Sequence, residues 1–262
     1  MRNRELVHSV EFAEHLTRKW ARKMFYPPRS AVYQLLGQWL AIGMEEVHEA
    51  KVLELGYGTG DFSKVIEEIS LYKDIQYTGI DISESFQAIA SKRLPGLRFT
   101  LGDGASLGFE NGCFDFSYTI DVLRHNERWG EILGELSRVT QHEVFVADIF
   151  GAESGEYDGF VERRNEFHVG HSHAWGAEYF AAEAQKHFNH ITVIPVPGHD
   201  NKAFILSNRD AYKEHVFQTP VHVVLSSLPP QQPILFGRMS KTRVFAVTIF
   251  RAVRNIARSA FH

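Results

Sequence analysis

The sequence has very little cysteine and no long uninterrupted apolar run. Cys113 is the single cysteine among 262 residues, so the chain cannot form an internal disulfide, and no Cys/His spacing suggests a structural zinc site. The segment after Met1 contains no apolar stretch of the length that a signal peptide or a transmembrane helix needs. We therefore expect a cytoplasmic protein with neither of these segments.

Acidic residues are missing from the last part of the sequence. Between His215 and His262 there is no Asp or Glu, but there are six Lys and Arg residues. The rest of the chain carries 22 basic and 32 acidic residues, a net charge of −10 that the overall value of −4 conceals. A basic segment on an acidic body predicts an anionic contact, such as peripheral attachment to a membrane or to a lipid-linked glycan. The alternative is a docking or homodimer helix over 241–261 whose basic residues face solvent.

Three glycines alternate directly after a short apolar run. Residues 52–55 lead into Gly56, Gly58 and Gly60, and Glu54 stands two residues before the first of them. The pattern predicts a strand, a tight turn and a helix start, where backbone N–H groups can meet a polar ligand. No Gly-Lys-Ser/Thr follows, which excludes a phosphate-binding P-loop, and the spacing differs from the Gly-x-Gly-x-x-Gly of dinucleotide-binding folds. We expect a nucleoside-bearing cofactor at this turn.

The Glu-x-Gly-x-Gly-x-Gly pattern resembles the first motif of class I S-adenosylmethionine-dependent methyltransferases. Residues 75–81 are similar to the family's second strand, which ends in an acid, and residues 99–105 are similar to its third motif. Residues 107–115 resemble the lead into the fourth strand, with Gly108 where the family has proline. The resemblance covers residues 50 to 207.

This resemblance implies S-adenosyl-L-methionine as the cofactor. In the family the acid at the position of Asp81 takes both ribose hydroxyls, the residue at Ile82 lies against the adenine, and the acid at Asp103 accepts a hydrogen bond from the adenine amino group. The implied contacts are Glu54, Gly56, Tyr57, Gly58, Gly60, Asp81, Ile82, Asp103 and Gly104. Two alternatives stay open, namely a parallel α/β sheet that merely needs glycines at its turns and a fold of this kind that catalyses nothing.

The order of patterns along the chain predicts an α/β protein with a parallel sheet. Helical and strand-like segments alternate, and such alternation places helices on both faces and ligands at the carboxyl ends of the strands. We expect a Rossmann-like class I methyltransferase fold, with a seven-stranded, mostly parallel sheet whose last strand is antiparallel. The domain covers 49–207, after an N-terminal helical cap over 1–48 and before a basic C-terminal extension over 208–262. The expected strands are 52–55, 75–81, 97–101, 114–120, 143–149, 191–196 and 202–206, and the expected helices are 61–70, 84–93, 127–139 and 174–187.

The N-terminal cap contains two predicted helices. Residues 5–24 have helical periodicity, and two prolines end that helix before a second one over 30–44. Such helices often cover the cofactor cleft in the family. The residues that could touch the methionine part of the cofactor, or else simply pack, are Tyr26, Arg29 and Tyr33.

The acceptor side of the site is expected near the fourth strand and in an insert over 151–173. This insert shows no regular pattern, and long irregular inserts in compact domains are usually functional. Asp121 lies at the end of the fourth strand and His125 in the loop after it, and both are candidates for a catalytic base, together with His171 from the insert. The residues expected to line the acceptor pocket are Asp148, Tyr157, His168 and His173.

Methyl transfer to a hydroxyl requires that the hydroxyl proton leave, so a base or a metal near the reacting group is useful. His168, His171 and His173 could converge on a metal. In the other reading His173 caps a helix that begins at Ala174 while the remaining two line the pocket, and we assign no metal.

The sequence predicts O-methylation of a small molecule or a glycan, possibly a lipid-linked one. The alternatives are N-methylation of a small molecule and a non-catalytic cofactor-binding or scaffold protein. Nucleic acid is not expected as a partner, because the body is acidic and the Asn/Asp-Pro-Pro-Tyr/Phe motif of base methylation is missing from the sequence.

Overall fold

The computed structural model describes residues 27–71, 73–148, 157–164, 169–196 and 201–209. The predicted helix over 5–24 and the basic extension beyond Arg209 lie outside these residues. The chain divides into two compact units after Lys213, and the described residues all belong to the first unit.

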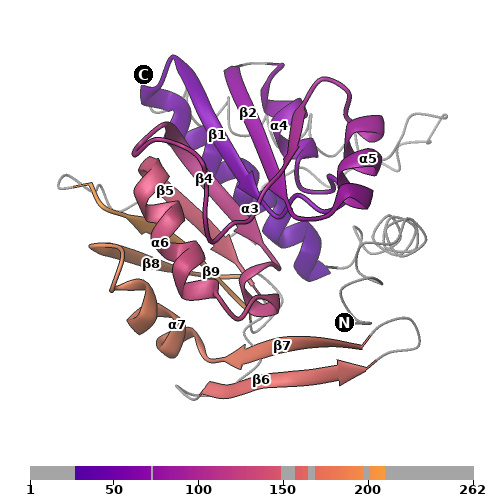
Figure 1. The fold of residues 1–262 in the computed structure, drawn as a ribbon. Coiled ribbons are helices and arrows are strands. Elements are labelled where there is room, and N and C mark those ends of the chain that lie inside the picture. The colour runs from indigo at the N-terminus through magenta and orange to yellow at the C-terminus, as the bar shows by residue number, and fades with distance from the viewer. Residues whose placement is uncertain (1–26, 72, 149–156, 165–168, 197–200, 210–262) are drawn as a thin grey trace, which may run out of the picture. The chain divides into compact units, whose positions relative to one another are not determined.

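A seven-stranded sheet forms the centre of this unit, in the order β3-β2-β1-β4-β5-β9-β8. All neighbouring pairs from β3 to β5 are parallel, and β9 runs antiparallel to both β5 and β8. This confirms the predicted mostly parallel sheet with an antiparallel last strand (Figure 1). The strands are β1 (Glu49–Leu55), β2 (Asp74–Asp81), β3 (Arg98–Leu101), β4 (Phe114–Ile120), β5 (Thr140–Ala147), β8 (His190–Pro195) and β9 (Lys202–Ser207).

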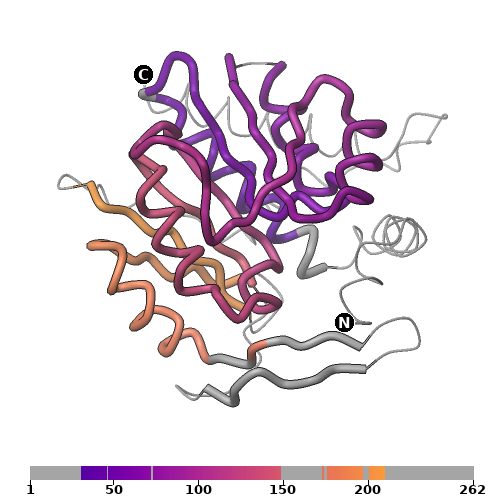
Figure 2. The backbone as a smooth tube through the Cα atoms, in the orientation of Figure 1, coloured from indigo at the N-terminus to yellow at the C-terminus, as the bar shows by residue number. Residues whose placement is uncertain are grey.

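The strand order reverses between β1 and β4. The chain builds outward from β1 through β2 to β3, then crosses back and continues from β4 through β5, and the tube in Figure 2 shows β9 beside β5 on that side. Leu55 pairs with Thr119 at the carboxyl ends of the two central strands. In open parallel sheets, ligands bind in the crevice outside the carboxyl ends at such a reversal.

Both faces of the central strands are buried, as their continuous apolar runs require. On one face, Leu53 and Leu55 belong to a core that also includes Leu133 and Leu136 of α6. On the other face the Trp39 indole of α3 packs against the rings of Phe116 and Phe145, with centroids 5.7 and 5.4 Å away. The indole N–H also donates to Oε2 of Glu143 at 2.7 Å.

The helices follow the predicted order, with shifted ends. The segment expected as a helix over 61–70 becomes helical at Lys64, because the glycine turn continues to residue 63. Ser83 caps the next helix through its hydroxyl, which accepts from the Phe86 N–H at 3.3 Å. Within the described ranges no helix is long and apolar enough to cross a membrane. The helices are α3 (Pro27–Gly43), η1 (Met44–Glu46), α4 (Lys64–Ile69), α5 (Glu84–Arg93), η2 (Leu123–His125), α6 (Trp129–Val139) and α7 (Ala177–Ala184).

The prediction of an irregular insert is wrong for its described part. Strands β6 (Tyr157–Arg164) and β7 (Val169–Trp175) form an antiparallel two-stranded sheet of their own (Figure 1). Aromatic and β-branched residues such as Phe160 and Val161 favour strands, but their period is broken by a register shift between Tyr157 and Phe160, which hides the pattern in the sequence.

The helix expected from Ala174 also begins later than predicted. Ala174 and Trp175 still belong to β7, and the N-cap of α7 is Gly176, whose backbone is extended and which has no side chain to cap with. His173 therefore does not cap the helix, which corrects that prediction.

Candidate functional site

The glycine turn after β1 adopts a backbone that only glycine takes at little cost. The φ angles of Gly56, Gly58 and Gly60 are 78°, 52° and 79°. A Cβ on Gly56 would lie 2.2 Å from Cγ2 of Val122, whereas a Cβ on Gly58 would meet nothing within 4 Å. The first glycine thus allows the turn to pack against the segment after β4, and the second leaves open space at the turn.

Asp81, the last residue of β2, fastens this turn. Its Oδ2 accepts from the Gly58 N–H at 2.9 Å and its Oδ1 accepts from the Ser83 N–H at 3.0 Å. The side chain of the next residue, Ile82, is 66% exposed, which is unusual for a large apolar residue at a strand end. A carboxylate and an exposed apolar side chain thus stand together beside the glycine turn.

The loop after β3 adds a second carboxylate. Oδ1 of Asp103 accepts from the Ala105 N–H at 3.0 Å, and Oδ2 accepts from Nη1 of Arg128 at 2.9 Å. A Cβ on Gly104 would lie 2.9 Å from both terminal methyl carbons of Leu55, so the glycine lets this loop pack against β1. The ion pair is half exposed, so the Asp103 carboxylate can also be reached from solvent.

Glu54 lies beneath the glycine turn, inside a buried hydroxyl network. Its Oε2 accepts from the hydroxyls of Ser63, Tyr77 and Tyr118 at 2.5, 2.6 and 2.8 Å. Burial raises the pKa of Glu54 to about 7, and the Asp81 carboxylate adds to this while the three hydroxyls oppose it. Glu54 thus ties β1, β2, β4 and the turn together, and its direct contact with a cofactor stays a prediction.

Tyr57 does not offer its side chain to the site. It is 3% exposed, its ring packs edge-on against Phe99 with centroids 4.8 Å apart, and its hydroxyl donates to the Thr100 carbonyl at 3.4 Å. The prediction of a cofactor contact is therefore wrong for the Tyr57 side chain and remains a prediction for its main chain.

The segment after β4 brings several charged groups together. Asp121 has a φ of 58°, which is uncommon for a residue other than glycine. Its Oδ1 lies 3.8 Å from Nη1 of Arg124 and 3.9 Å from Nε2 of His125. The His125 side chain is about half exposed, whereas Arg124 is buried. The structure thus brings the predicted Asp121 and His125 side chains together.

Asp148 follows β5, next to this segment. It is 3% exposed, and burial raises the pKa of its carboxyl to about 8. The Asp121 carboxylate raises this pKa further, while the Arg124 guanidinium and the nearby N–H groups of Leu123 and Arg124 lower it. Neither carboxyl oxygen meets hydrogen-bond geometry with any group in the described part of the chain.

His173 connects the β6–β7 hairpin to the segment after β4. Its Nε2 lies 3.0 Å from the Asn126 carbonyl oxygen, its ring stands edge-on to Trp129 with centroids 6.3 Å apart, and burial lowers its pKa. His173 therefore lies beside η2, on which strand β7 also packs.

The other residues predicted in the insert are not placed by the structure. His168 lies outside the described residues, as do the side chains of Tyr157 and His171. Of the N-terminal candidates, Tyr26 and the side chain of Arg29 are also outside, while the Tyr33 ring lies 6.3 Å from that of Phe62. Among the side chains that are described, no three His, Cys, Asp or Glu residues lie together as a metal site.

Two arginines of the site, Arg93 and Arg124, were not predicted from the sequence. Arg93 donates through Nη1 to the Thr59 carbonyl and through Nη2 to Oδ1 of Asp61 at 2.8 Å, so it holds the glycine turn from α5. Arg124 stands in the segment Asp121–His125, where its buried position could not be foreseen. The sequence offered one signal for Arg124, which is its place as a basic residue in the short loop between the acidic residues Asp121 and Glu127.

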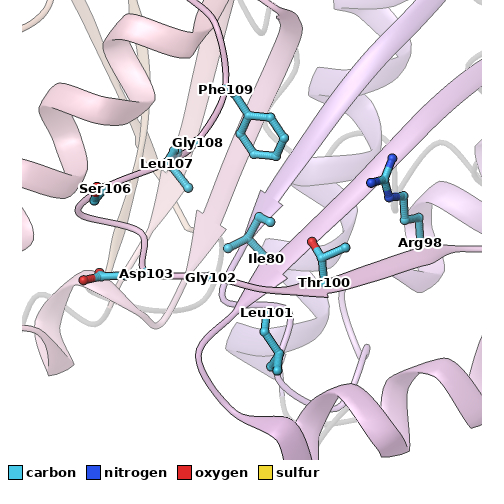
Figure 3. A pocket seen from close by; sticks show the side chains of 10 residues that line it. All are labelled: Ile80, Arg98, Thr100, Leu101, Gly102, Asp103, Ser106, Leu107, Gly108 and Phe109. Atoms are coloured by element: carbon cyan, nitrogen blue, oxygen red, sulfur yellow. The ribbon is translucent and has the colours of Figure 1, made fainter.

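A hollow of about 250 Å³ opens at the β3 edge of the sheet (Figure 3). Of the predicted cofactor contacts it includes Asp103 alone, so it is not the space beside the glycine turn. The residues that line it are Ile80, Arg98, Thr100, Leu101, Gly102, Asp103, Ser106, Leu107, Gly108 and Phe109.

Comparison with known proteins agrees with this geometry. Residues 53–147 match the family model described as a methyltransferase domain. The chain is 30% identical over 139 residues to the demethylmenaquinone methyltransferase of Thermotoga maritima. The aligned residues cover 48% of this chain and 59% of that protein. The chain is 26% identical over 123 residues to a sterol 24-C-methyltransferase of Neurospora crassa, covering 44% and 32%. The chain therefore spans about three fifths and one third of the lengths of these curated relatives.

Solved structures share the fold. CalS10, an amino pentose methyltransferase from Micromonospora echinaspora solved with S-adenosylmethionine, superposes with a TM-score of 0.54 at 14% identity and covers 72% of this chain and 97% of that one. The PH0226 protein of Pyrococcus horikoshii gives a TM-score of 0.52 at 20% identity, covering 64% and 86%. At such identities the likeness shows the fold.

The sheet order, the reversal at β1 and β4 and the glycine turn define a Rossmann-like α/β protein built to hold a nucleoside-bearing ligand. Residues 53–147 match a methyltransferase domain, and this part of the chain is similar to the class I S-adenosylmethionine-dependent methyltransferase family. S-adenosylmethionine is the cofactor of this family. The residues fit it, because the Asp81 carboxylate is held at the turn and a Cβ built on Gly58 would meet no described atom within 4 Å.

Proposed function

We propose that the protein is an S-adenosylmethionine-dependent methyltransferase that acts on a hydroxyl of a small molecule or a glycan. The observation that carries this proposal is the close packing of Val122 on Gly56, which puts Asp121 and His125 next to the glycine turn. The residues that would hold the cofactor are the turn glycines, Asp81, Ile82, Asp103 and Gly104. When bound, the cofactor supplies a methyl group on a positively charged sulfur.

The residues of the chain then have two tasks. The first is to hold the acceptor in line with the methyl group, and positioning of this kind contributes several kcal/mol, on the order of 7 or more in well-oriented systems. The second is to remove the acceptor proton. Asp121 and His125 lie within 3.9 Å of each other and so provide a carboxylate and an imidazole for that task.

The acceptor pocket is proposed to include Asp148, Tyr157, His168 and His173, with His171 as a further candidate base. What supports this is that the family model ends at residue 147, before Asp148 and the hairpin. The proposed acceptor residues thus lie outside the matched methyltransferase domain.

A carbon acceptor is the second candidate. The two curated relatives are named for demethylmenaquinone and for carbon 24 of a sterol. Methyl transfer to a carbon also requires a base, because the carbon that takes the methyl group must then lose a proton. Asp121 and Asp148 therefore suit either kind of acceptor, and the position of the transferred methyl group decides between them.

Transfer of a tritiated methyl group tests these candidates directly. The full-length protein is incubated with methyl-labelled donor and with a phenol, a hydroquinone, a hexose and a primary amine in parallel, and each product is separated and degraded to find the labelled atom. Label on oxygen supports the proposal, label on carbon or nitrogen replaces it, and donor binding with no transfer indicates a non-catalytic protein.

For the basic segment beyond Arg209 we propose peripheral contact with an anionic membrane or a lipid-linked glycan on the cytoplasmic side. The support is the run of 48 residues without an acid and with six basic residues. Co-sedimentation with phosphatidylglycerol vesicles should recover the full-length protein and not a protein ending at Asp210. Equal recovery of the two, together with a dimer of the longer protein in solution, would favour a homodimer helix.

A further inference from the structure

Two carboxyl groups at the ends of neighbouring strands have buried oxygens that meet hydrogen-bond geometry with no described group. Oδ1 of Asp121 and both carboxyl oxygens of Asp148 are buried and meet hydrogen-bond geometry with no group in the described ranges. Buried polar atoms are nearly always hydrogen-bonded in native proteins, because leaving one without a partner is costly. Arg124 and His125 lie 3.8 and 3.9 Å from Oδ1 of Asp121, and the N–H groups of Leu123 and Arg124 act on Asp148, so these oxygens have polar neighbours and can still accept from a further donor.

The two carboxyl groups differ in exposure. The Asp148 residue is 3% exposed, whereas the side chain of Asp121 is 29% exposed. Of the two carboxyl groups, that of Asp121 is therefore the one that solvent and a ligand can reach. The Asp121 backbone N–H donates to the Ala147 carbonyl at 2.9 Å, which fixes the two strand ends against each other.

The charged groups around this pair come from η2. Arg124 lies 3.8 Å from Asp121 and His125 lies 3.9 Å from it, and both carry the opposite charge when protonated. On the other side of β5, strand β9 places the apolar Ala203 opposite Ala147. Two carboxyl groups of like charge thus lie beside one buried arginine. In such a pair, ionisation of one carboxyl group raises the free energy that is needed to ionise the other.

We propose that Asp121 and Asp148 form a single proton-accepting pair for a hydroxyl acceptor, in which Asp121 touches the acceptor and Asp148 is the positioning residue that sets the proton affinity of the pair. This inference rests on the proposed function and names the groups that do its proton chemistry. Arg124 keeps one of the two charges neutralised, so that the pair can exist in its doubly ionised state.

In the proposed step the acceptor is a hydroxyl compound, R–OH. The oxygen lone pair forms the new O–C bond as the C–S bond of the sulfonium donor breaks, and the electrons of that bond stay on sulfur, which becomes a neutral thioether. The O–H proton passes to the Asp121–Asp148 pair, whose charge changes from −2 to −1. The proton is then released to solvent, which restores the charge of the pair. His125 can carry it there, because its half-exposed side chain lies 3.9 Å from Asp121.

The first test is a titration that needs no acceptor. The full-length protein, with ¹³C-carboxyl-labelled aspartate, is followed by NMR from pH 5 to 10, as are Asp148→Asn, Asp121→Asn and the control Asp115→Asn. We expect one aspartate signal with a midpoint of about 8 that is lost in Asp148→Asn. Its midpoint should fall by about one pH unit in Asp121→Asn, because the neighbouring charge is gone, and stay in place in Asp115→Asn.

The second test uses the hydroxyl compound from the panel above that is methylated fastest. In the wild type, kcat should rise with pH and level off above about 8. Asp121→Asn should lower kcat at pH 9 by about 10²-fold or more. Asp148→Asn should lower it by about 10-fold and remove the alkaline rise, with unchanged donor affinity in both variants.

The outcomes separate this inference from the proposed function. The absence of an aspartate titrating above pH 6, or a titration that Asp121→Asn leaves unmoved, overturns the pair even when methyl transfer is observed. The expected titration without transfer to any acceptor overturns the proposed function and leaves the pair in place.

Discussion

The two halves of the crevice are built in different ways. On the donor side, at the ends of β1, β2 and β3, the carboxylate oxygens of Asp81 and Oε2 of Glu54 are held by backbone N–H or hydroxyl donors within the chain. At the ends of β4 and β5, where we propose the acceptor side, three buried oxygens of Asp121 and Asp148 meet hydrogen-bond geometry with no donor in the described ranges.

This difference shows which half is preorganised. A satisfied network fixes the glycine turn before any ligand arrives, and it lowers the entropy cost of binding a nucleoside. The unsatisfied carboxyl groups cost stability and are retained where a ligand or a reaction uses them. We therefore interpret the donor half as a preformed cradle and propose that the acceptor half holds the reactive groups.

The largest effect is expected from Gly56→Ala, which attacks the contact between the two halves. The added Cβ would lie 2.2 Å from Val122 on a backbone with φ of 78°, and we expect a loss of about 2–4 kcal/mol in the free energy of unfolding, measured in urea. Gly96→Ala, with nothing within 4 Å, is the control and should change stability by less than about 0.5 kcal/mol. Val122→Ala should recover part of the loss in Gly56→Ala, and no recovery would mean that the two halves do not meet there.

A smaller effect, confined to the donor side, is expected from Asp81→Ala. The variant loses the acceptor of the Gly58 N–H and the proposed ribose contact, and hydrogen bonds to a charged group contribute about 1.5–3 kcal/mol. Donor affinity should fall about 10- to 100-fold by calorimetry. Asp74→Ala, at the opposite end of the same strand, should bind as the wild type does, and equal weakening in both variants would point to a general loss of β2.

The contribution of Asp148 can be measured from the pH dependence of stability as a difference from the wild type, because Glu54 on the donor side, with a pKa of about 7, titrates in the same range. The folded-state pKa of Asp148 is about 8, above the unfolded value of 3.8, so its contribution to stability is lost as pH rises toward 8. The stability of Asp148→Asn relative to the wild type should therefore increase by about 1–2 kcal/mol from pH 6 to pH 8 and level off above that. A difference that stays constant over this range, followed by urea unfolding, would mean that Asp148 is ionised throughout.

The smallest effect is expected for the connection between the hairpin and the acceptor side. His173→Leu removes the contact with the Asn126 carbonyl and should cost about 1 kcal/mol. In His173→Leu we expect faster amide hydrogen exchange in β7 and η2, and unchanged exchange in the other described elements. His173→Gln keeps a donor and should show less of the change, and a uniform increase across the sheet in either variant would show that the hairpin is not anchored locally.

The sequence was sufficient for the fold and for the donor side. Alternating helix and strand patterns, with Asp81 and Asp103 at strand ends, depend on local chemistry and on a parallel topology with few solutions. The hairpin could not be predicted, because the register shift near Tyr157 breaks its period of two. The inward turn of Tyr57 and the burial of Asp148 also could not, since both follow from packing between distant segments.

Donor binding measured by calorimetry on Asp81→Ala and Asp148→Asn, side by side, tests the division of the crevice most directly. The account predicts that Asp81→Ala loses most of its affinity for S-adenosylmethionine, whereas Asp148→Asn binds it as tightly as the wild type and is impaired only in methyl transfer. Weak donor binding by Asp148→Asn, or wild-type binding by Asp81→Ala, would contradict the account.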